Sequence, residues 1–244
     1  MTIESATRRT LPFRIVKVQS PRGPCRPMLL VAFVAIVSVL APVLPAPSAA
    51  AFEPDLFDEL YVRGQKQNGG LNTLTASFVE TSTSSLLSKP LVARGTVFVE
   101  RPSRIALRYT DPDERTLLID GDRMTVWWPA AKIRTATDIS SSQRRIQKYF
   151  VDTSPKELRS HFELSARDAQ DRPGTYLITM VPKRKQIQEG ISRLELWVDR
   201  QSLLLAAMRM TFQGGDTKLM TFADVKPNVP IDPSVFRIAP ASDL

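Results

Sequence analysis

The chain has 244 residues, a formal net charge of +8, one cysteine and one histidine. Six of its 33 basic residues and one of its 25 acidic residues precede residue 52, so residues 52–244 keep 27 basic and 24 acidic side chains and a net charge of only +3. So small a charge argues against nucleic-acid binding, and the scarcity of cysteine and histidine argues against zinc sites and cysteine-based catalysis.

Residues 1–51 are predicted to be a signal peptide for export. Basic residues from Arg8 to Arg26 precede an apolar run from Met28 to Leu44. The part of this run before Pro42 would span only about 21 Å as a helix, short of the ~30 Å hydrocarbon core of a membrane. Ala49 and Ala51 match the small-residue preference of a signal peptidase. We therefore expect cleavage near Ala51 and a periplasmic protein.

Residues 52–244 are predicted to form one domain, because their length suits a single core and no linker divides them. The domain begins with an amphipathic helix that starts near Pro54 and ends near Gly69 and Gly70. The apolar face of this helix consists of Leu56, Phe57, Leu60 and Tyr61. Such a face must pack against another part of the domain.

From Thr75 onward, short alternating apolar and polar segments predict a series of strands. Asp120-Gly121, Pro173-Gly174 and Gly214-Gly215 are the turn signals between them. The strands follow one another too closely for crossover helices, so we expect an antiparallel, meandering sheet. The groups expected to share a face are Ile105, Leu107 and Tyr109; Met124, Val126 and Trp128; Tyr176, Ile178 and Met180; Leu194, Leu196 and Val198; and Leu204, Ala206, Met208, Met210 and Phe212.

One stretch interrupts the strand pattern. Residues Ser140 to Phe150 begin with serines and continue with basic and apolar residues, among them Ile146. Pro155 then begins a second short helical turn. We interpret both as helices that lie over an opening of the sheet. The expected fold class is therefore mainly β with covering helices.

Few residues of the domain suit catalysis or metal binding. Cys25 would leave with the signal peptide, and His161, at an apparent strand start, is the one histidine. A lone histidine is more often structural than catalytic. Asp111, Asp113 and Glu114 flank a proline, which favours a solvated turn over a pair of catalytic carboxylates. We expect no catalytic residue, no metal and no cofactor.

Two further groups of residues each have two interpretations. The basic residues at 183–185 and within 144–148 either meet anionic headgroups or an acidic partner, or are solvated. Met208, Met210 and Trp128 either line a lipid cavity or fill a core. Periodicity places these three on the inside and does not distinguish a filled interior from an empty one.

The order of short motifs from Gly95 to Pro129 resembles that of the periplasmic outer-membrane lipoprotein carriers, the LolA family. The shared features are a glycine that opens a strand, Arg101-Pro102, a strand that ends in Tyr109, Pro112-Asp113-Glu114, Asp120-Gly121 and an aromatic pair before Pro129. Leu71, Leu74 and Phe78 resemble the family's passage from its first helix into its first strand. Val235 to Pro240 resembles the closing strand. Residues 140–185 match by pattern alone.

This resemblance implies an incomplete, open antiparallel β-barrel whose inner face, under a helical lid, takes up the acyl chains of lipoproteins. It implies a monomer that receives cargo from an inner-membrane lipoprotein-releasing transporter and passes it to an outer-membrane lipoprotein acceptor. Arg101 matches the family's arginine before proline, which helps hold the lid closed and is needed for cargo release. The residues expected to line the cavity are Phe78, Val97, Val99, Ile105, Leu107, Tyr109, Met124, Val126, Trp128, Ile146, Leu196, Met208 and Met210.

Three positions depart from the family pattern. Ile105 and Leu107 stand where the family has cavity-facing aromatic residues, and Glu80 stands where it often has glutamine. These departures leave open a relative that carries another lipid or glycolipid, or that senses mislocalised lipoproteins. Two further functions stay open: a hydrolase of envelope polymers, built on His161 or the Asp111 to Glu114 carboxylates, and a packed domain without a cavity.

Overall fold

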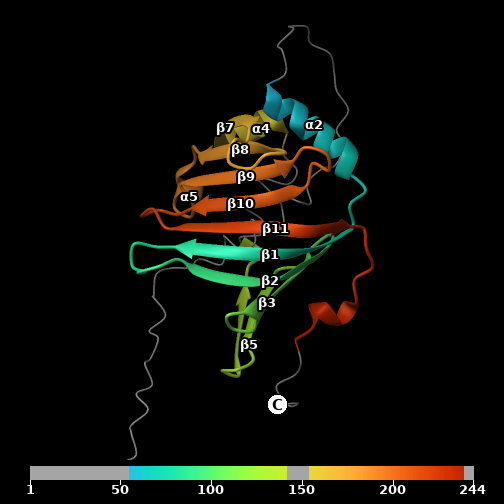
Figure 1. The fold of residues 1–244 in the computed structure, drawn as a ribbon, viewed down its shortest axis with the longest axis vertical. Coiled ribbons are helices and arrows are strands. Elements are labelled where there is room, and N and C mark those ends of the chain that lie inside the picture. The colour runs from blue at the N-terminus through green and yellow to red at the C-terminus, as the bar shows by residue number, and fades with distance from the viewer. Residues whose placement is uncertain (1–54, 142–153, 239–244) are drawn as a thin grey trace, which may run out of the picture.

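The structure is a computed structural model that describes residues 55–141 and 154–238, and most of these residues belong to one antiparallel sheet (Figure 1). The first group of strands is β1 (Thr73–Thr83), β2 (Leu91–Glu100), β3 (Arg104–Asp111), β4 (Arg115–Asp120), β5 (Arg123–Trp128) and β6 (Ile133–Asp138). The second group is β7 (Phe162–Asp168), β8 (Thr175–Pro182), β9 (Arg193–Asp199), β10 (Leu205–Thr211) and β11 (Thr217–Pro227).

The spatial order of the strands is β6-β5-β4-β3-β2-β1-β11-β10-β9-β8-β7. Each group is a meander of consecutive antiparallel strands, and β6 and β7 form the two edges of an open sheet. The predicted meandering, antiparallel, open sheet is therefore confirmed. The two meanders are joined by the pair β1 and β11, in which Leu74 lies opposite Pro227.

Glycines make two of the tight turns at positive values of the backbone angle φ. Gly121, between β4 and β5, has φ 54°, and Gly214 and Gly215, between β10 and β11, have φ 93° and 90°. A residue without a side chain adopts these values with little strain. Both turns lie where the sequence predicted them.

The predicted opening helix is present as α2 (Leu56–Asn68). It begins there because the side chain of Asp55 accepts a hydrogen bond from the main-chain nitrogen of Phe57 at 3.3 Å. Phe57 and Leu60 are its buried residues. Figure 1 shows α2 running past the β7 edge of the sheet toward the start of β1. The helix therefore buries one apolar face against the sheet.

The helical turn predicted at Pro155 is also confirmed, as α4 (Pro155–His161). Ser154 and Glu157 form a capping box, in which each side chain accepts a hydrogen bond from the main-chain nitrogen of the other residue, at 3.3 and 2.9 Å. His161 was expected at the start of a strand. It is instead the last residue of α4, because the capped helix continues through it and β7 starts at Phe162. A short helix, α5 (Lys185–Gln188), connects β8 to β9.

The two faces of the sheet differ in composition. One face, here called the inner face, carries buried apolar side chains from β1 to β5 and from β7 to β11, and these pack in one cluster with residues of α2, α4 and α5. The opposite, outer face carries a small second cluster around Trp197. The inner cluster includes the alternating residues that the sequence predicted: Ile105, Leu107, Tyr109, Ile178, Met180, Leu194, Leu196, Met208 and Met210.

In β10 the observed alternation differs from the predicted one. The pairing of β10 with β9 shifts register between Leu205 and Ala207, and Leu205 lies opposite Val198. Leu205 packs against the inner cluster, where Ala206 was expected. Such an irregularity in the pairing of two strands moves a residue to the opposite face of its strand, and here it turns Leu205 toward the inner cluster.

The segment after β11 also differs from its expected form. The predicted closing strand began at Val235, but Val235 and Phe236 belong to the 3-10 helix η2 (Pro233–Phe236), and residues 239 and 240 lie outside the described residues. This helix forms because the Asp232 carboxylate accepts a hydrogen bond from the main-chain nitrogen of Ser234 at 2.8 Å and proline begins the turn. The guanidinium group of Arg108 donates to the main-chain oxygen of Val235 at 2.8 Å. This contact holds η2 on the outer side of β3.

Candidate functional site

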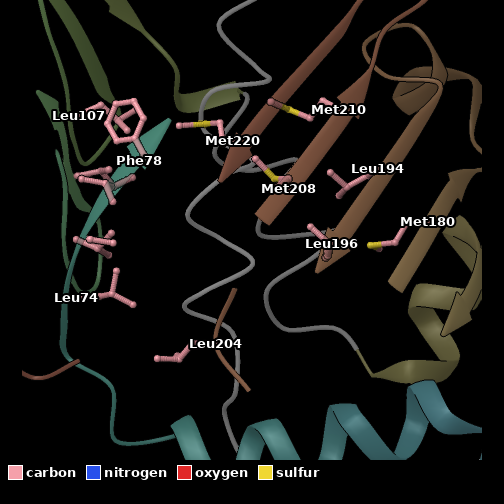
Figure 2. Packing of buried hydrophobic residues seen from close by; sticks show 14 of the residues in the cluster. Leu74, Phe78, Leu107, Met180, Leu194, Leu196, Leu204, Met208, Met210 and Met220 are labelled. Carbon is pink, nitrogen blue, oxygen red and sulfur yellow. The ribbon is translucent and has the colours of Figure 1, made fainter. Parts of the chain in front are cut away.

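The inner face is the candidate site, and Figure 2 shows side chains from its two halves pointing toward each other. Phe78 and Leu107 come from the first meander, and Leu194, Met208 and Met210 come from the second. The sequence-predicted residues that are buried in this cluster are Phe78, Val97, Val99, Ile105, Leu107, Tyr109, Met124, Leu196, Met208 and Met210. Residues from both ends of the chain therefore form one apolar surface.

Three of the predicted residues have a different position. Val126 is only partly buried against the cluster, and Trp128 is half-buried at the end of β5. Ile146 lies outside the described residues, as does the rest of the predicted covering segment from residue 142 on. Its role as a lid stays a prediction.

The list of residues expected to line the cavity left out part of the second half of the inner face. Met180, Leu194 and Met220 are buried there beside Met208 and Met210. The alternation of apolar and polar residues in β8 and β9 indicates that Met180 and Leu194 lie on this face, whereas Met220 was not predicted. Methionine side chains are flexible and adapt to varied apolar shapes. The second half of this face is therefore the more adaptable one.

A close aromatic contact lies in the first half of the inner face. The rings of Phe78 and Tyr109 meet edge to face, with their centroids 5.0 Å apart. Gly95, expected to open a strand, lies inside β2 between them. A Cβ atom there would lie 2.9 Å from the Phe78 ring and 2.2 Å from the main-chain oxygen of Arg108. Glycine is needed at this point because the neighbouring backbone and ring fill the space.

A buried ionic group interrupts the apolar inner face. The carboxylate of Glu80, which is 4% exposed, accepts hydrogen bonds from the Tyr109 hydroxyl at 2.8 Å and from Nζ of Lys218 at 2.9 Å. A guanidinium nitrogen of Arg115 lies 3.7 Å from the same carboxylate. These four residues are here called the Glu80 cluster. In the sequence, Glu80 is a charged residue at a position where the alternation of β1 places buried apolar residues, and this is the feature that could have indicated the cluster.

The Glu80 cluster holds one negative and two positive charges. Burial raises the pKa of Tyr109, and the negative charge of Glu80 raises it further, so the hydroxyl stays protonated and donates to the carboxylate. The guanidinium carbon of Arg115 lies 3.8 Å from the centroid of the Tyr109 ring. The side chains of Arg115 and Lys218 are 32% and 23% exposed, against 5% for Glu80. The cations are therefore more accessible than the anion.

Arg101 lies at the opposite end of the inner face, in the turn between β2 and β3. Its main-chain nitrogen donates to the oxygen of Asn72, just before β1, at 2.9 Å. Nε and Nη2 of its side chain are buried and have no hydrogen-bond partner within residues 55–141 and 154–238. Burial lowers the pKa of this guanidinium group. The contact to covering helices that the resemblance implies stays a prediction.

Helix α2 connects this end to the β7 edge of the sheet. Near its start, Nη2 of Arg159 in α4 lies 2.7 Å from Asp55 and 3.0 Å from Asp58. Near its other end, the side chain of Asn68 donates to the main-chain oxygen of Leu203, in the β9–β10 turn, at 3.2 Å. Polar contacts at the rim therefore hold α2 in place.

The catalytic candidates lie apart. His161 ends α4 next to the edge strand β7, whereas Asp111 ends β3, in the other half of the sheet. Asp111 is exposed and pairs with Arg94 at 3.2 Å. The two described stretches, residues 55–141 and 154–238, hold no group of three or more histidine, cysteine, aspartate or glutamate residues that suits a metal ion.

The basic loop at residues 183–185 has an ordinary structural position. Nζ of Lys183 donates to the main-chain oxygen of Arg159 at 2.9 Å, and Arg184 precedes α5. All three basic residues are exposed, and whether they meet an acidic partner stays a prediction. Among the residues that the structure describes, no helix has the length and apolar character needed to cross a membrane.

Solved structures of remote similarity are found in several organisms. An uncharacterized conserved protein from Thermus thermophilus has a TM-score of 0.48 and 9% identity over 74% of this chain and 93% of that one. The Mycobacterium tuberculosis lipoprotein LppX has a TM-score of 0.44 and 16% identity over 71% of this chain and 96% of that one. Because these similarities are remote, family membership rests on sequence.

Two curated relatives are outer-membrane lipoprotein carrier proteins. The protein of Pseudoalteromonas translucida (strain TAC 125) is 25% identical over 181 residues, which are 72% of this chain and 81% of the relative. The protein of Pseudomonas fluorescens (strain Pf0-1) is 22% identical over 165 residues, 68% of this chain and 77% of the relative. The family described as outer membrane lipoprotein carrier protein LolA matches residues 69–239. With a match over most of its length, this chain belongs to the LolA family.

Proposed function

We propose that this protein is a periplasmic carrier that binds the acyl chains of lipoproteins on its inner face and moves them from the inner to the outer membrane. In this proposal, an inner-membrane lipoprotein-releasing transporter loads the carrier and an outer-membrane lipoprotein acceptor unloads it. Residues 1–51 direct export and are removed near Ala51. The carrier works as a monomer and makes or breaks no covalent bond.

The observation that carries this proposal is the apolar inner face. It gathers large apolar side chains from ten strands into one cluster, and the curated relatives are lipoprotein carriers. One acyl chain of about 15 methylenes withdrawn from water gains roughly 12 kcal/mol, at ~0.8 kcal/mol per methylene. A multiply acylated protein therefore needs such a surface to cross an aqueous compartment.

Release requires that the apolar surface be covered again once the lipid leaves. Helix α2 already packs Phe57 and Leu60 into the inner cluster. Polar contacts at its two ends hold it there, and we infer that these break and re-form as cargo enters and leaves. In this proposal Arg101, at the end of the face that α2 approaches, stabilises the closed form and thereby drives cargo release.

The test measures transfer of a lipoprotein into solution. Inner-membrane vesicles that contain a triacylated lipoprotein and its releasing transporter are mixed with ATP and the protein purified from the periplasm. We expect the lipoprotein to leave the vesicles as a soluble complex with the protein in about equal amounts. If the folded protein leaves all of the lipoprotein in the vesicles, the proposed function is wrong.

A further inference from the structure

The Glu80 cluster is built from parts of the chain that are distant in sequence. Glu80 lies in β1, Tyr109 in β3, Arg115 in β4 and Lys218 in β11. Antiparallel register places their side chains at one end of the inner face, since Glu80 lies opposite Met220 and Tyr109 lies opposite Arg115. The apolar surface around Phe78 continues directly into this cluster, because Phe78 contacts the Tyr109 ring.

The charges within the cluster do not balance. One carboxylate faces two cations whose side chains are 32% and 23% exposed, so the cluster carries an excess positive charge that an anion reaching it can neutralise. The Glu80 oxygens already accept from Tyr109 and Lys218. Arg115 lies 3.7 Å from Glu80, beyond hydrogen-bond distance. Arg115 also interacts with the side chain of Tyr109. Because a guanidinium group carries five donor hydrogens and an ammonium group three, both residues keep donors that an additional anion can use.

We propose that the Glu80 cluster binds the acidic head of an acyl lipid whose hydrocarbon chain lies on the inner face. This rests on the proposed function and extends it, because the cargo then includes a lipid with a phosphate or carboxylate group. Charge-assisted hydrogen bonds from guanidinium and ammonium groups to such a head are strong and directional. Glu80 contacts both cations, with Nζ of Lys218 at 2.9 Å and a guanidinium nitrogen of Arg115 at 3.7 Å, and the Tyr109 ring lies against Arg115.

The test compares two probes with the same acyl chain, oleoyl lysophosphatidate and monooleoylglycerol, which differ in the phosphate. Their affinities are measured by calorimetry on the protein purified from the periplasm of cells that express the full chain. We expect the phosphate-bearing probe to bind about tenfold tighter, the range of one charge-assisted contact. Arg115→Gln and Lys218→Gln should each reduce this preference to about twofold or less, while affinity for the neutral probe stays within about twofold.

Two controls separate head recognition from structural support. Lys218→Arg keeps the charge and should keep the preference. Arg94→Gln removes an exposed cation from the outer side of β2 and should also keep it. If Lys218→Gln fails to fold, Arg115→Gln carries the test, because its distance to Glu80 is the longer one.

The outcomes distinguish this inference from the proposed function. If both probes bind equally well and the variants change neither affinity, head recognition is wrong and the carrier proposal stands. If the variants weaken both probes alike, the cluster is structural and the inference is also overturned. If neither probe binds the folded protein, acyl binding itself fails and the proposed function falls with it.

Discussion

The two ends of the inner face hold their charged groups in opposite ways. At the Glu80 end, a buried carboxylate is bound by a hydroxyl at 2.8 Å and an ammonium group at 2.9 Å. At the other end, Nε and Nη2 of Arg101 are buried without a hydrogen-bond partner among the described residues. The Glu80 end is therefore the firmly held end, and the Arg101 end is the one expected to rearrange.

This difference fits a carrier that must be both stable and able to open. Four strands contribute to the Glu80 cluster, so opening that end would separate several partners at once. At the Arg101 end, α2 is tied to the β9–β10 turn by side-chain amides. Such contacts are weak enough to exchange for water. Substitutions at the two ends should therefore have very different effects on stability.

The largest expected effect is at the Glu80 end. Glu80→Ala leaves Lys218 and Tyr109 without their acceptor and should lower the free energy of unfolding by about 3–5 kcal/mol. Urea unfolding measures this loss. Glu80→Gln keeps an acceptor of the same size and should cost clearly less. Equal stability of the alanine variant and the wild type would show that this end is not firmly held.

Gly95→Ala should have the next largest effect. The new methyl group would lie 2.2 Å from the main-chain oxygen of Arg108, so β2 and β3 must separate locally. We expect a loss of about 1–3 kcal/mol in the free energy of unfolding, the usual range for overpacking. Gly70→Ala, where a Cβ meets nothing within 4 Å, is the matched control. A loss of the same size in both variants would contradict the proposed close packing.

Tyr109→Phe should have a smaller effect that depends on pH. It removes one hydrogen bond to Glu80, worth about 1 kcal/mol at neutral pH. In the wild type, the raised pKa of Tyr109 means that the folded state holds this proton more tightly than the unfolded state. The stability that this tighter binding of the proton contributes is complete below a pH of about 10, the pKa of tyrosine in the unfolded state. It is lost as the pH rises toward the pKa of Tyr109 in the folded state.

The measurement is urea unfolding between pH 8 and pH 11. The wild type should lose stability above about pH 10 more steeply than Tyr109→Phe does. Parallel curves for the two proteins would mean that Tyr109 titrates normally, and the described burial beside Glu80 would be wrong.

The smallest expected effect on stability is at Arg101. Arg101→Leu removes no side-chain hydrogen bond within the described residues, so the free energy of unfolding should change by no more than about 1 kcal/mol. The proposed function adds that this variant binds lipid and releases it more slowly. Urea unfolding and the rate of lipid transfer to acceptor vesicles measure the two effects. Unfolding of the variant, or release at the wild-type rate, would contradict this account.

Most of the fold was predictable because alternation and turn chemistry act within a single hairpin. Gly121, Gly214 and the Pro155 helix start were found from neighbours in sequence. The pairing of β1 with β11 was not, since it joins Leu74 to Pro227, and no local pattern specifies such a contact. The shift at Leu205 and the 3-10 turn before Phe236 were missed because each depends on the partner strand or on capping.

The site was predictable only in part, for the same reason. Alternation identified the apolar residues of the inner face, such as Ile105 and Met208, because burial follows the period of the strand. The Glu80 cluster joins β1, β3, β4 and β11, so its members became partners only through long-range register. Arg101 was identified through its resemblance to a family motif, since an arginine before a proline carries no signal of its own.

The most direct test of the central claim, that the inner face carries acyl lipid, is native mass spectrometry of the protein purified gently from the periplasm, followed by lipid extraction. We expect a population heavier than the chain from Phe52 to Leu244 by the mass of a lipoprotein or an acyl lipid. The extract would identify the cargo. A bare protein that also fails to bind an added acylated peptide would contradict the claim and favour a packed domain without a lipid site.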